Sequence, residues 1–105
     1  MPQPAFMVGQ IKVKDFKAYF ERYASQVRAQ AEQFGGEFLV ATTRAEVNEG
    51  AWDCNWTVVI RFPSKDAALA FYHSPGYAPL KAMRIDELTD SGNLVLLPGL
   101  DLTSQ

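Results

Sequence analysis

Apolar side chains recur at every second position over residues 5–13, where Ala5, Met7, Ile11 and Val13 share one side of an extended segment. A period of two is typical of a β-strand, because successive side chains point to opposite faces. Apolar segments of similar length predict further strands at about 37–46, 53–62 and 93–97. The pattern therefore predicts four strands.

Two other segments carry apolar residues at steps of three or four, which is the spacing of an amphipathic helix. The first follows Asp15, whose carboxylate can cap a helix, and ends at Gly35-Gly36. The second begins at the capping residue Ser64 and is broken by Pro75-Gly76. A short helical turn at 79–84 and a polar loop are expected before the last strand.

The predicted order is strand, helix, strand, strand, helix, strand. This is the ferredoxin-like βαββαβ arrangement of the α+β class, in which right-handed crossovers place two helices on one face of a four-stranded antiparallel sheet. We expect one such domain over residues 1–105.

The strands carry apolar residues in both alternating phases, so both faces of the sheet are predicted to be apolar. One helical layer covers only one face, and a monomer that left the other in water would expose a large apolar patch. We therefore expect a homodimer in which the sheets of two copies face each other. The opposed sets are Met7 and Ile11 against Phe6 and Val8, Phe38 and Val40 against Leu39 and Ala41, and Leu94 and Leu96 against Val95 and Leu97.

Composition narrows the function classes. Hydrophobic residues make up 48% of the 105 residues, which excludes a disordered chain, and a net charge of −2 gives no electrostatic basis for nucleic-acid binding. One cysteine and one histidine exclude an internal disulfide framework and a closed Cys/His zinc site. No signal peptide or bilayer-spanning run is found, so we expect a cytoplasmic protein with no membrane partner, metal or cofactor.

Four stretches together resemble one known family, the Domain of Unknown Function 1330 family. They are GGEFLV at 35–40, VVIRFPSKDAA at 58–68, YHSPGY at 72–77 and NLVLLPG at 93–99. The resemblance covers about Phe6 to Gly99 and implies the dimeric α+β barrel superfamily. That superfamily includes cofactor-independent monooxygenases, muconolactone isomerases and haem-handling enzymes, whereas the family itself implies no agreed activity.

The sequence departs from the family pattern at three places. Glu37 stands where a basic residue usually follows the double glycine, and Ala41-Thr42-Thr43 stands where Arg-Gly-Gly is common. Arg61 replaces the acidic residue usual near the end of the third strand. Any site that the family builds from these positions is therefore not expected in this chain.

Six residues are the main candidates for a site, and two further arginines are weaker ones. His73, the single histidine, could act as an acid or base, although an imidazolium in the last turn of a helix would also complement the helix dipole. Tyr23, Trp56, Tyr72 and Tyr77 could be the walls of a small-molecule pocket, or plain core. Arg84 could hold a carboxylate, as Arg44 and Arg61 could, with surface solvation as the alternative for each.

These residues predict an uncharacterised homodimeric small-molecule-binding protein with a pocket between sheet and helices. An alternative is an enzyme of the cofactor-independent monooxygenase or isomerase type that acts on a small aromatic or lactone substrate, with His73 or a tyrosine moving the proton. A structural module without a pocket, and a haem protein with His73 as axial ligand, are further alternatives.

Overall fold

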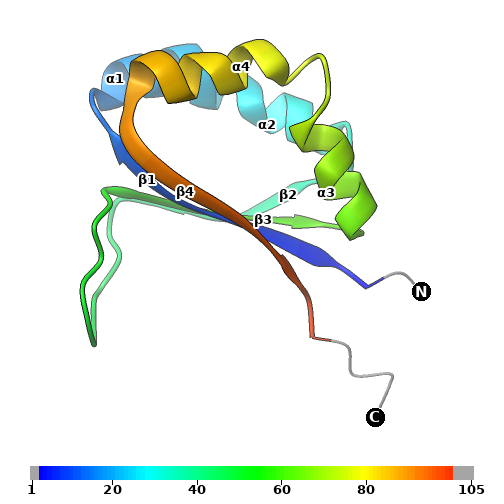
Figure 1. Cartoon of the computed structure of the whole chain (residues 1–105), viewed down its shortest axis with the longest axis horizontal. Helices are drawn as coiled ribbons and strands as arrows, with labels where there is room; N and C mark the ends of the chain where they lie inside the picture. The colour runs from blue at the N-terminus through cyan, green and yellow to red at the C-terminus, as the bar shows by residue number, and fades with distance from the viewer. Residues whose placement is uncertain (1–2, 101–105) are drawn as a thin grey trace.

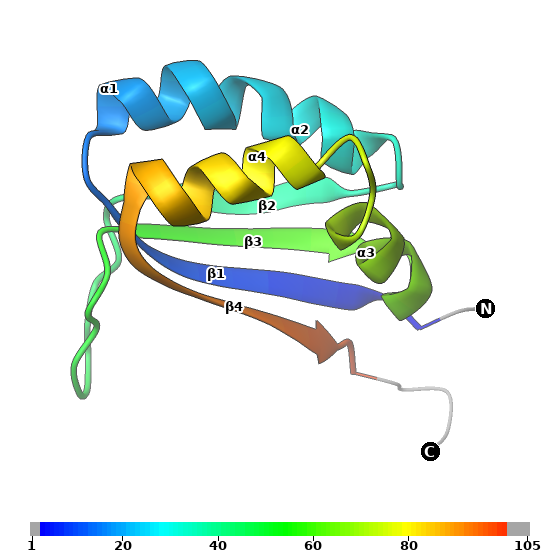
Figure 2. The same ribbon diagram turned by 45° about the horizontal axis from the view of Figure 1, so that its top comes forward.

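Four antiparallel strands form the sheet in a computed structural model that describes residues 3–100 (Figure 1). The strands are β1 (Ala5–Val13), β2 (Glu37–Thr42), β3 (Trp56–Phe62) and β4 (Thr89–Pro98). They lie in the order β2-β3-β1-β4, and every neighbouring pair is antiparallel (Figure 2). The sheet agrees with the predicted antiparallel one, and β2 and β4 are its edges.

The first crossover is a continuous helix made of α1 (Phe16–Tyr19), the π-helical η1 (Phe20–Ala24) and α2 (Ser25–Glu32). Asp15 caps it as predicted, because its Oδ1 accepts from the amides of Lys17 at 2.9 Å and Ala18 at 3.4 Å. Gly35 closes the other end at φ +81°, a left-handed conformation that favours glycine.

The second crossover holds α3 (Lys65–Tyr72), α4 (Ala78–Met83) and the π-helical η2 (Arg84–Leu88). The predicted cap at Ser64 is confirmed by its Oγ, which accepts from the amide of Ala67 at 3.1 Å. The predicted polar loop is wrong, because Asp86 and Glu87 are the exposed side of η2 while Leu88 is buried. The crossover therefore contains more helix than the single helix and short turn expected.

The last strand begins four residues earlier than predicted, at Thr89. Backbone pairing with β1 continues through Ser91 and Gly92, so hydrogen bonding extends the strand beyond its apolar residues. Conversely, β2 and β3 are shorter than predicted, and residues 43–55 form a long loop that extends away from the helices (Figure 1).

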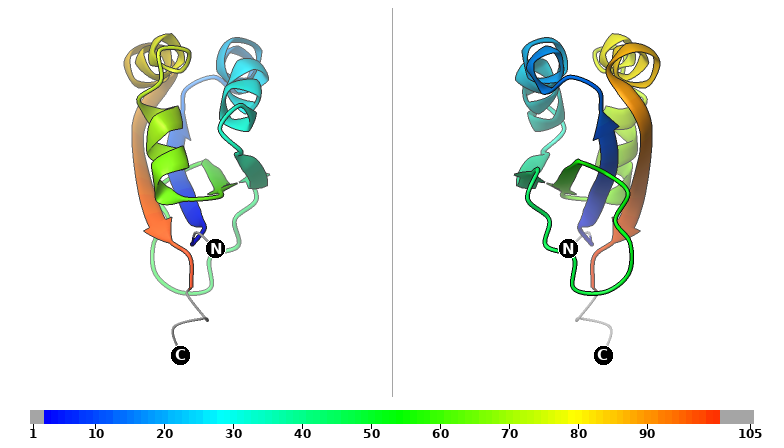
Figure 3. Two further views of the ribbon diagram at one scale, coloured as in Figure 1. Left: turned by 90° about the vertical axis from the view of Figure 1, so that its right-hand side faces the viewer. Right: turned by 90° about the vertical axis from the view of Figure 1, so that its left-hand side faces the viewer.

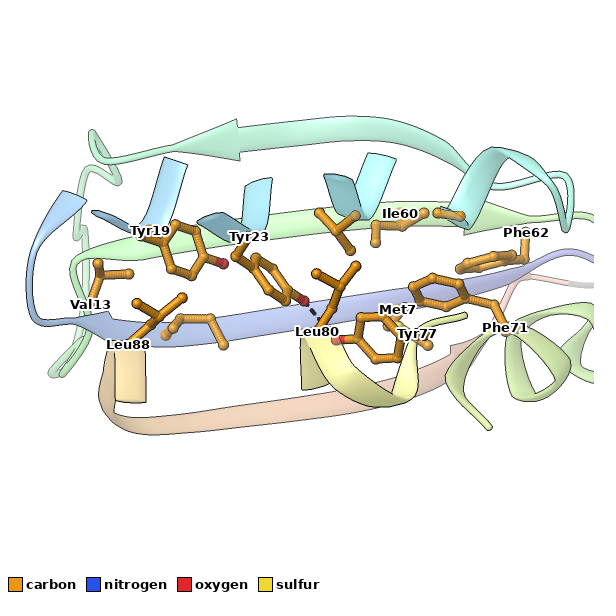
Figure 4. Close-up of a cluster of buried hydrophobic side chains, with 14 residues drawn as sticks. Met7, Val13, Tyr19, Tyr23, Ile60, Phe62, Phe71, Tyr77, Leu80 and Leu88 are labelled. Carbon is orange, nitrogen blue, oxygen red and sulfur yellow. Dashed lines mark hydrogen bonds between the residues drawn. The ribbon is translucent and has the colours of Figure 1, made fainter. Parts of the chain in front are cut away.

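All helical segments cover the same face of the sheet (Figure 3). Between them and the sheet lies the core, drawn in Figure 4, which consists of Met7, Ile11, Val13, Tyr19, Tyr23, Val27, Ala31, Ile60, Phe62, Ala68, Phe71, Tyr77, Leu80 and Leu88. No helix within residues 3–100 is long and apolar enough to cross a membrane.

The opposite face of the sheet carries apolar residues, with one change from the predicted sets. The register shifts between Phe38 and Val40, because Leu39 forms a bulge in β2. An extra residue reverses the alternation, so Val40 pairs with Val59 on the uncovered face, whereas Ala41 pairs with Val58 on the helix face. The prediction that Phe38 and Val40 share a face is therefore wrong.

Candidate functional site

A cavity of about 240 Å³ lies between the helices and the sheet. All four strands, the long helix and the second crossover contribute to its wall. The lining residues are Met7, Ile11, Tyr19, Phe20, Tyr23, Ala24, Val27, Arg28, Phe38, Ala41, Trp56, Val58, Ile60, Phe71, Tyr77, Arg84 and Leu94. A concave apolar site with few polar groups is the usual form of a small-molecule pocket.

The floor of this cavity is the helix face of the sheet, and Gly9 of β1 lies at its centre. A Cβ at Gly9 would lie 2.8 Å from Cγ1 of Val58 and 3.3 Å from Cδ1 of Leu94, the side chains of its two strand neighbours. Both side chains line the cavity, so the missing Cβ lets them close over β1 and shape the floor.

Aromatic rings from β3 and from the helices form the wall around this floor. The ring of Trp56 meets that of Phe20 edge-on at 5.2 Å and that of Tyr19 at 6.3 Å between centroids. The series continues from Tyr19 to Tyr23 at 5.0 Å, and from Tyr77 to Phe71 at 4.5 Å. Aromatic pairs at these distances stabilise one another, so the wall is a continuous series of packed rings.

The hydroxyls of Tyr23 and Tyr77 lie 2.6 Å apart and form a buried hydrogen bond, drawn as a dashed line in Figure 4. Burial is the main cause that raises the pKa of Tyr23 well above its usual value, and the neighbouring phenols of Tyr77 and Tyr19 add to it. Burial likewise raises the pKa of Tyr19. These two phenols are therefore protonated at neutral pH and act as hydrogen-bond donors as well as acceptors.

Among residues 3–100, Arg84 is the only charged residue that is buried, with 6% of its surface exposed. Its position depends on η2, the π-helical turn whose first residue it is, and Oγ1 of Thr89 donates to its backbone carbonyl at 2.8 Å. The guanidinium lies beside Gly92 of β4, where a Cβ would be in ordinary contact with Nη1 at 3.8 Å. Burial lowers the pKa of Arg84, but the phenols of Tyr77, Tyr23 and Tyr19 outweigh it, so the net shift is upward.

Both π-helical turns contribute to the site. η1 supplies Phe20, Tyr23 and Ala24 to the cavity, and η2 supplies Arg84. π-Helical turns are rare and occur frequently at functional sites, since the extra residue re-aims the side chains around it.

The cavity opens at one side of the molecule. Phe20, Arg28 and Ala41 are the exposed members of the lining, and they come from the long helix and from the edge strand β2. Arg84 belongs to the far side, over β4. The cavity therefore runs across the sheet, from a mouth at β2 to a buried guanidinium at β4.

Four of the six candidate residues line this cavity, namely Tyr23, Trp56, Tyr77 and Arg84. Tyr72 lies instead beside a second hollow, which it shares with Arg84, and Nζ of Lys81 covers its ring at 4.2 Å. His73 is exposed at the end of α3 with its ring edge-on to Tyr72, and it lines neither hollow. Arg44 and Arg61 are exposed outside the cavity.

Sequence reasoning did not single out Phe20, Arg28 or Phe71 as site residues, although all three line the cavity. Helical periodicity indicates that Phe20 faces the sheet, but it cannot separate a core position from a cavity wall. Within residues 3–100, no group of three His, Cys, Asp or Glu side chains could hold a metal ion.

Residues 4–100 match the family model described as "Domain of unknown function (DUF1330)". Among solved structures, a protein of unknown function from Rhodopseudomonas palustris is similar with a TM-score of 0.76 at 14% identity, over 96% of this chain and 85% of that one. A mutant of SnoaB, a cofactor-independent oxygenase from Streptomyces nogalater, has a TM-score of 0.69 at 17% identity, over 98% and 99%.

A dimeric ferredoxin-like protein of unknown function from Thermobifida fusca has a TM-score of 0.54 at 12% identity, over 94% of this chain and 93% of that one. No match to a curated protein was found. At identities this low, the structural likeness shows a shared ferredoxin-like α+β fold.

Proposed function

The chain belongs to the DUF1330 family, a family described without an activity, and from its cavity we propose that it is a homodimeric small-molecule-binding protein. The observation that carries the proposal is the cavity between helices and sheet, walled by Tyr19, Tyr23, Trp56 and Tyr77 and ended by Arg84. A volume of about 240 Å³ suits a small ligand, since an apolar cavity of about 150 Å³ accepts benzene.

An enzyme of the monooxygenase type is the second candidate, and the fold it shares with the cofactor-independent oxygenase SnoaB supports it. Such a reaction would begin with removal of a proton from the substrate. The lining of the cavity holds no carboxylate, imidazole or lysine, and its buried phenols Tyr19 and Tyr23 have raised pKa values that make them weak sources of a base at neutral pH. The side chains therefore favour binding over proton transfer.

The dimer is proposed from the uncovered face of the sheet. The strand register aligns four valines across all four strands, Val40, Val59, Val8 and Val95 in that order. On the edge strand, Val95 and Leu97 are each 48% exposed. A second copy of the same sheet would cover this row, and the T. fusca protein of similar fold is described as dimeric.

The chain offers a direct optical test of binding in the cavity, because its two tryptophans differ in position. Trp56 lines the cavity, whereas Trp52 lies in the exposed loop before β3. In a Trp52→Phe variant, the emission of Trp56 alone is expected to change when cinnamamide, a neutral single-ring probe, is added. A Trp56→Phe variant, which keeps Trp52, is expected to show no change.

A blocking variant separates binding in the cavity from binding elsewhere. Ala24→Phe, in the Trp52→Phe background, adds a ring inside the lining and is expected to abolish the response. Ala29→Phe adds the same ring to an exposed position of the same helix and is its matched control. Equal responses from the two variants, or a response from Trp52 alone, would contradict the proposal.

A further inference from the structure

Resting on the proposed function, we infer that the natural ligand is a small aromatic oxyanion, with an aryl-bearing carboxylate as the type case. The inference assigns the charged end of the ligand to Arg84 and its ring to the aromatic wall near Trp56. It specifies the chemical class of the ligand, which neither the fold nor the family supplies.

Arg84 brings a positive charge to the cavity. No carboxylate of residues 3–100 lies within 4.0 Å of its guanidinium, and the three ion pairs of this part of the chain are all elsewhere. A buried charge without a partner costs several kcal/mol, so such groups are normally paired. The neighbouring phenols stabilise the guanidinium, but they are neutral at neutral pH, and an anionic ligand would supply the opposite charge that no carboxylate of this part of the chain supplies.

The side chains of Tyr23, Tyr77 and Arg84 can offer hydrogen-bond donors to a ligand. Tyr23 and Tyr77 share one of their two hydroxyl protons in the mutual bond, which leaves the other proton for a ligand. Arg84 carries five N–H donors and no acceptor. The lining holds no carboxylate to receive these protons, so a ligand that accepts hydrogen bonds fits and a cationic ligand does not.

The cavity is charged on one side and aromatic on the other. Arg84 lies over β4 on the side away from β2, where it also lines the second hollow, while Trp56 and Phe20 lie toward the mouth. A molecule with its charge at one end and a ring at the other matches this order. The planar guanidinium fork also matches the two oxygens of a carboxylate.

The test compares an acid with its amide on the same protein. Cinnamate and cinnamamide have the same ring and chain and differ in charge, and their dissociation constants can be measured by calorimetry at neutral pH. We expect the unmodified protein to bind cinnamate at least about tenfold more tightly than cinnamamide. Arg84→Gln is expected to remove this preference while it leaves the affinity for cinnamamide within about threefold.

Two variants control for other causes. Arg44→Gln removes an exposed arginine outside the cavity, in the loop after β2, and is expected to keep the preference for the acid. Asp90→Asn tests whether Asp90, which lines the second hollow with Arg84, neutralises the guanidinium. If Asp90→Asn alone creates the preference for the acid, the inference is wrong, because Arg84 is then paired within the chain.

The outcomes separate the inference from the proposal on which it rests. Equal affinity of the unmodified protein for acid and amide overturns the inference and leaves the proposed binding function standing. No binding of either probe overturns both. The acid–amide comparison needs no variant, so the test remains decisive even if Arg84→Gln does not fold.

Discussion

Arg84 and the tyrosines around it form a site in which buried polar groups are turned toward a cavity. The Tyr23–Tyr77 hydrogen bond fixes two of the phenols, and Thr89 fixes the backbone of Arg84. A core built for stability alone would not bury a guanidinium without a carboxylate. On the proposed function, this group is retained for a ligand at some expense of stability.

Replacement of Arg84 by an apolar residue distinguishes a role in ligand binding from a role in the stability of the core. Arg84→Met removes a buried charge and keeps much of the side-chain volume, so we expect the free energy of unfolding in the absence of ligand to be unchanged or to rise, by up to about 4 kcal/mol, since the phenols that stabilise the charge offset part of the gain. Urea denaturation followed by circular dichroism would measure it. A loss of stability of similar size would mean that Arg84 is a structural residue of the core.

The buried phenol of Tyr23 makes a prediction about pH. Its pKa is raised in the folded protein above the usual value of 10.0, so its contribution to stability is fully present below about pH 10 and is lost as the pH rises further. Tyr23→Phe removes this ionisation, and the fall in unfolding free energy between about pH 9 and about pH 11 should become smaller. An unchanged fall in the variant would show that Tyr23 does not titrate as its burial requires.

Individual residues of the site were predictable only in part. Tyr23, Trp56 and Tyr77 could be selected from the sequence because they are aromatic residues at helical and strand spacing, and Arg84 because it follows a proline-started turn near Tyr77. The placement of His73 and Tyr72 outside the cavity depends on the end of α3 and the path to α4, which no local pattern specifies. Phe20 and Phe71 have the same periodicity as core residues, so the sequence cannot distinguish wall from core.

At the scale of the element, local signals determine where the helices begin and end. Asp15 and Ser64 cap their helices through hydrogen bonds to backbone amides, and Gly35 ends the first one. These signals act over a few residues and could therefore be predicted. The two π-helical turns and the bulge at Leu39 could not, because tertiary packing selects them against the regular form.

The cap at Asp15 supports the helix that carries much of the cavity wall. Asp15→Ala is expected to lower the free energy of unfolding by about 0.5–2 kcal/mol, because two backbone amides lose their acceptor. Asp15→Asn keeps an acceptor oxygen and should lose only a few tenths of a kcal/mol. Denaturation midpoints of the two variants would check this, and equal losses would show that charge rather than capping is responsible.

At the scale of the whole molecule, the ferredoxin-like sheet uses its two faces differently. One face lies under the helices and forms the cavity floor, and the other carries the valine row that ends at Val95. The antiparallel sheet and the helices on one face could be predicted from the order of elements. The size of the cavity could not, because it depends on side-chain packing at the level of single methylene groups.

The uncovered face predicts a dimer that a single charge can disrupt. Val95→Lys places an ammonium group within the proposed interface, at the β4 end of the valine row, so we expect the protein to become monomeric at micromolar concentration. Ala82→Lys adds the same charge to the exposed side of α4 and should leave the dimer intact. Sedimentation velocity would compare the two, and a dimer that tolerates Val95→Lys would place the interface on another surface.

Native mass spectrometry of the full chain, titrated with cinnamate, tests the central claim most directly because it reports assembly and binding together. The account predicts a species of twice the chain mass that takes up one cinnamate per chain, with uptake abolished in Arg84→Gln. A monomer would contradict this account. A dimer that takes up no cinnamate, or that takes up as much in the Arg84→Gln variant as in the unmodified protein, would contradict it as well.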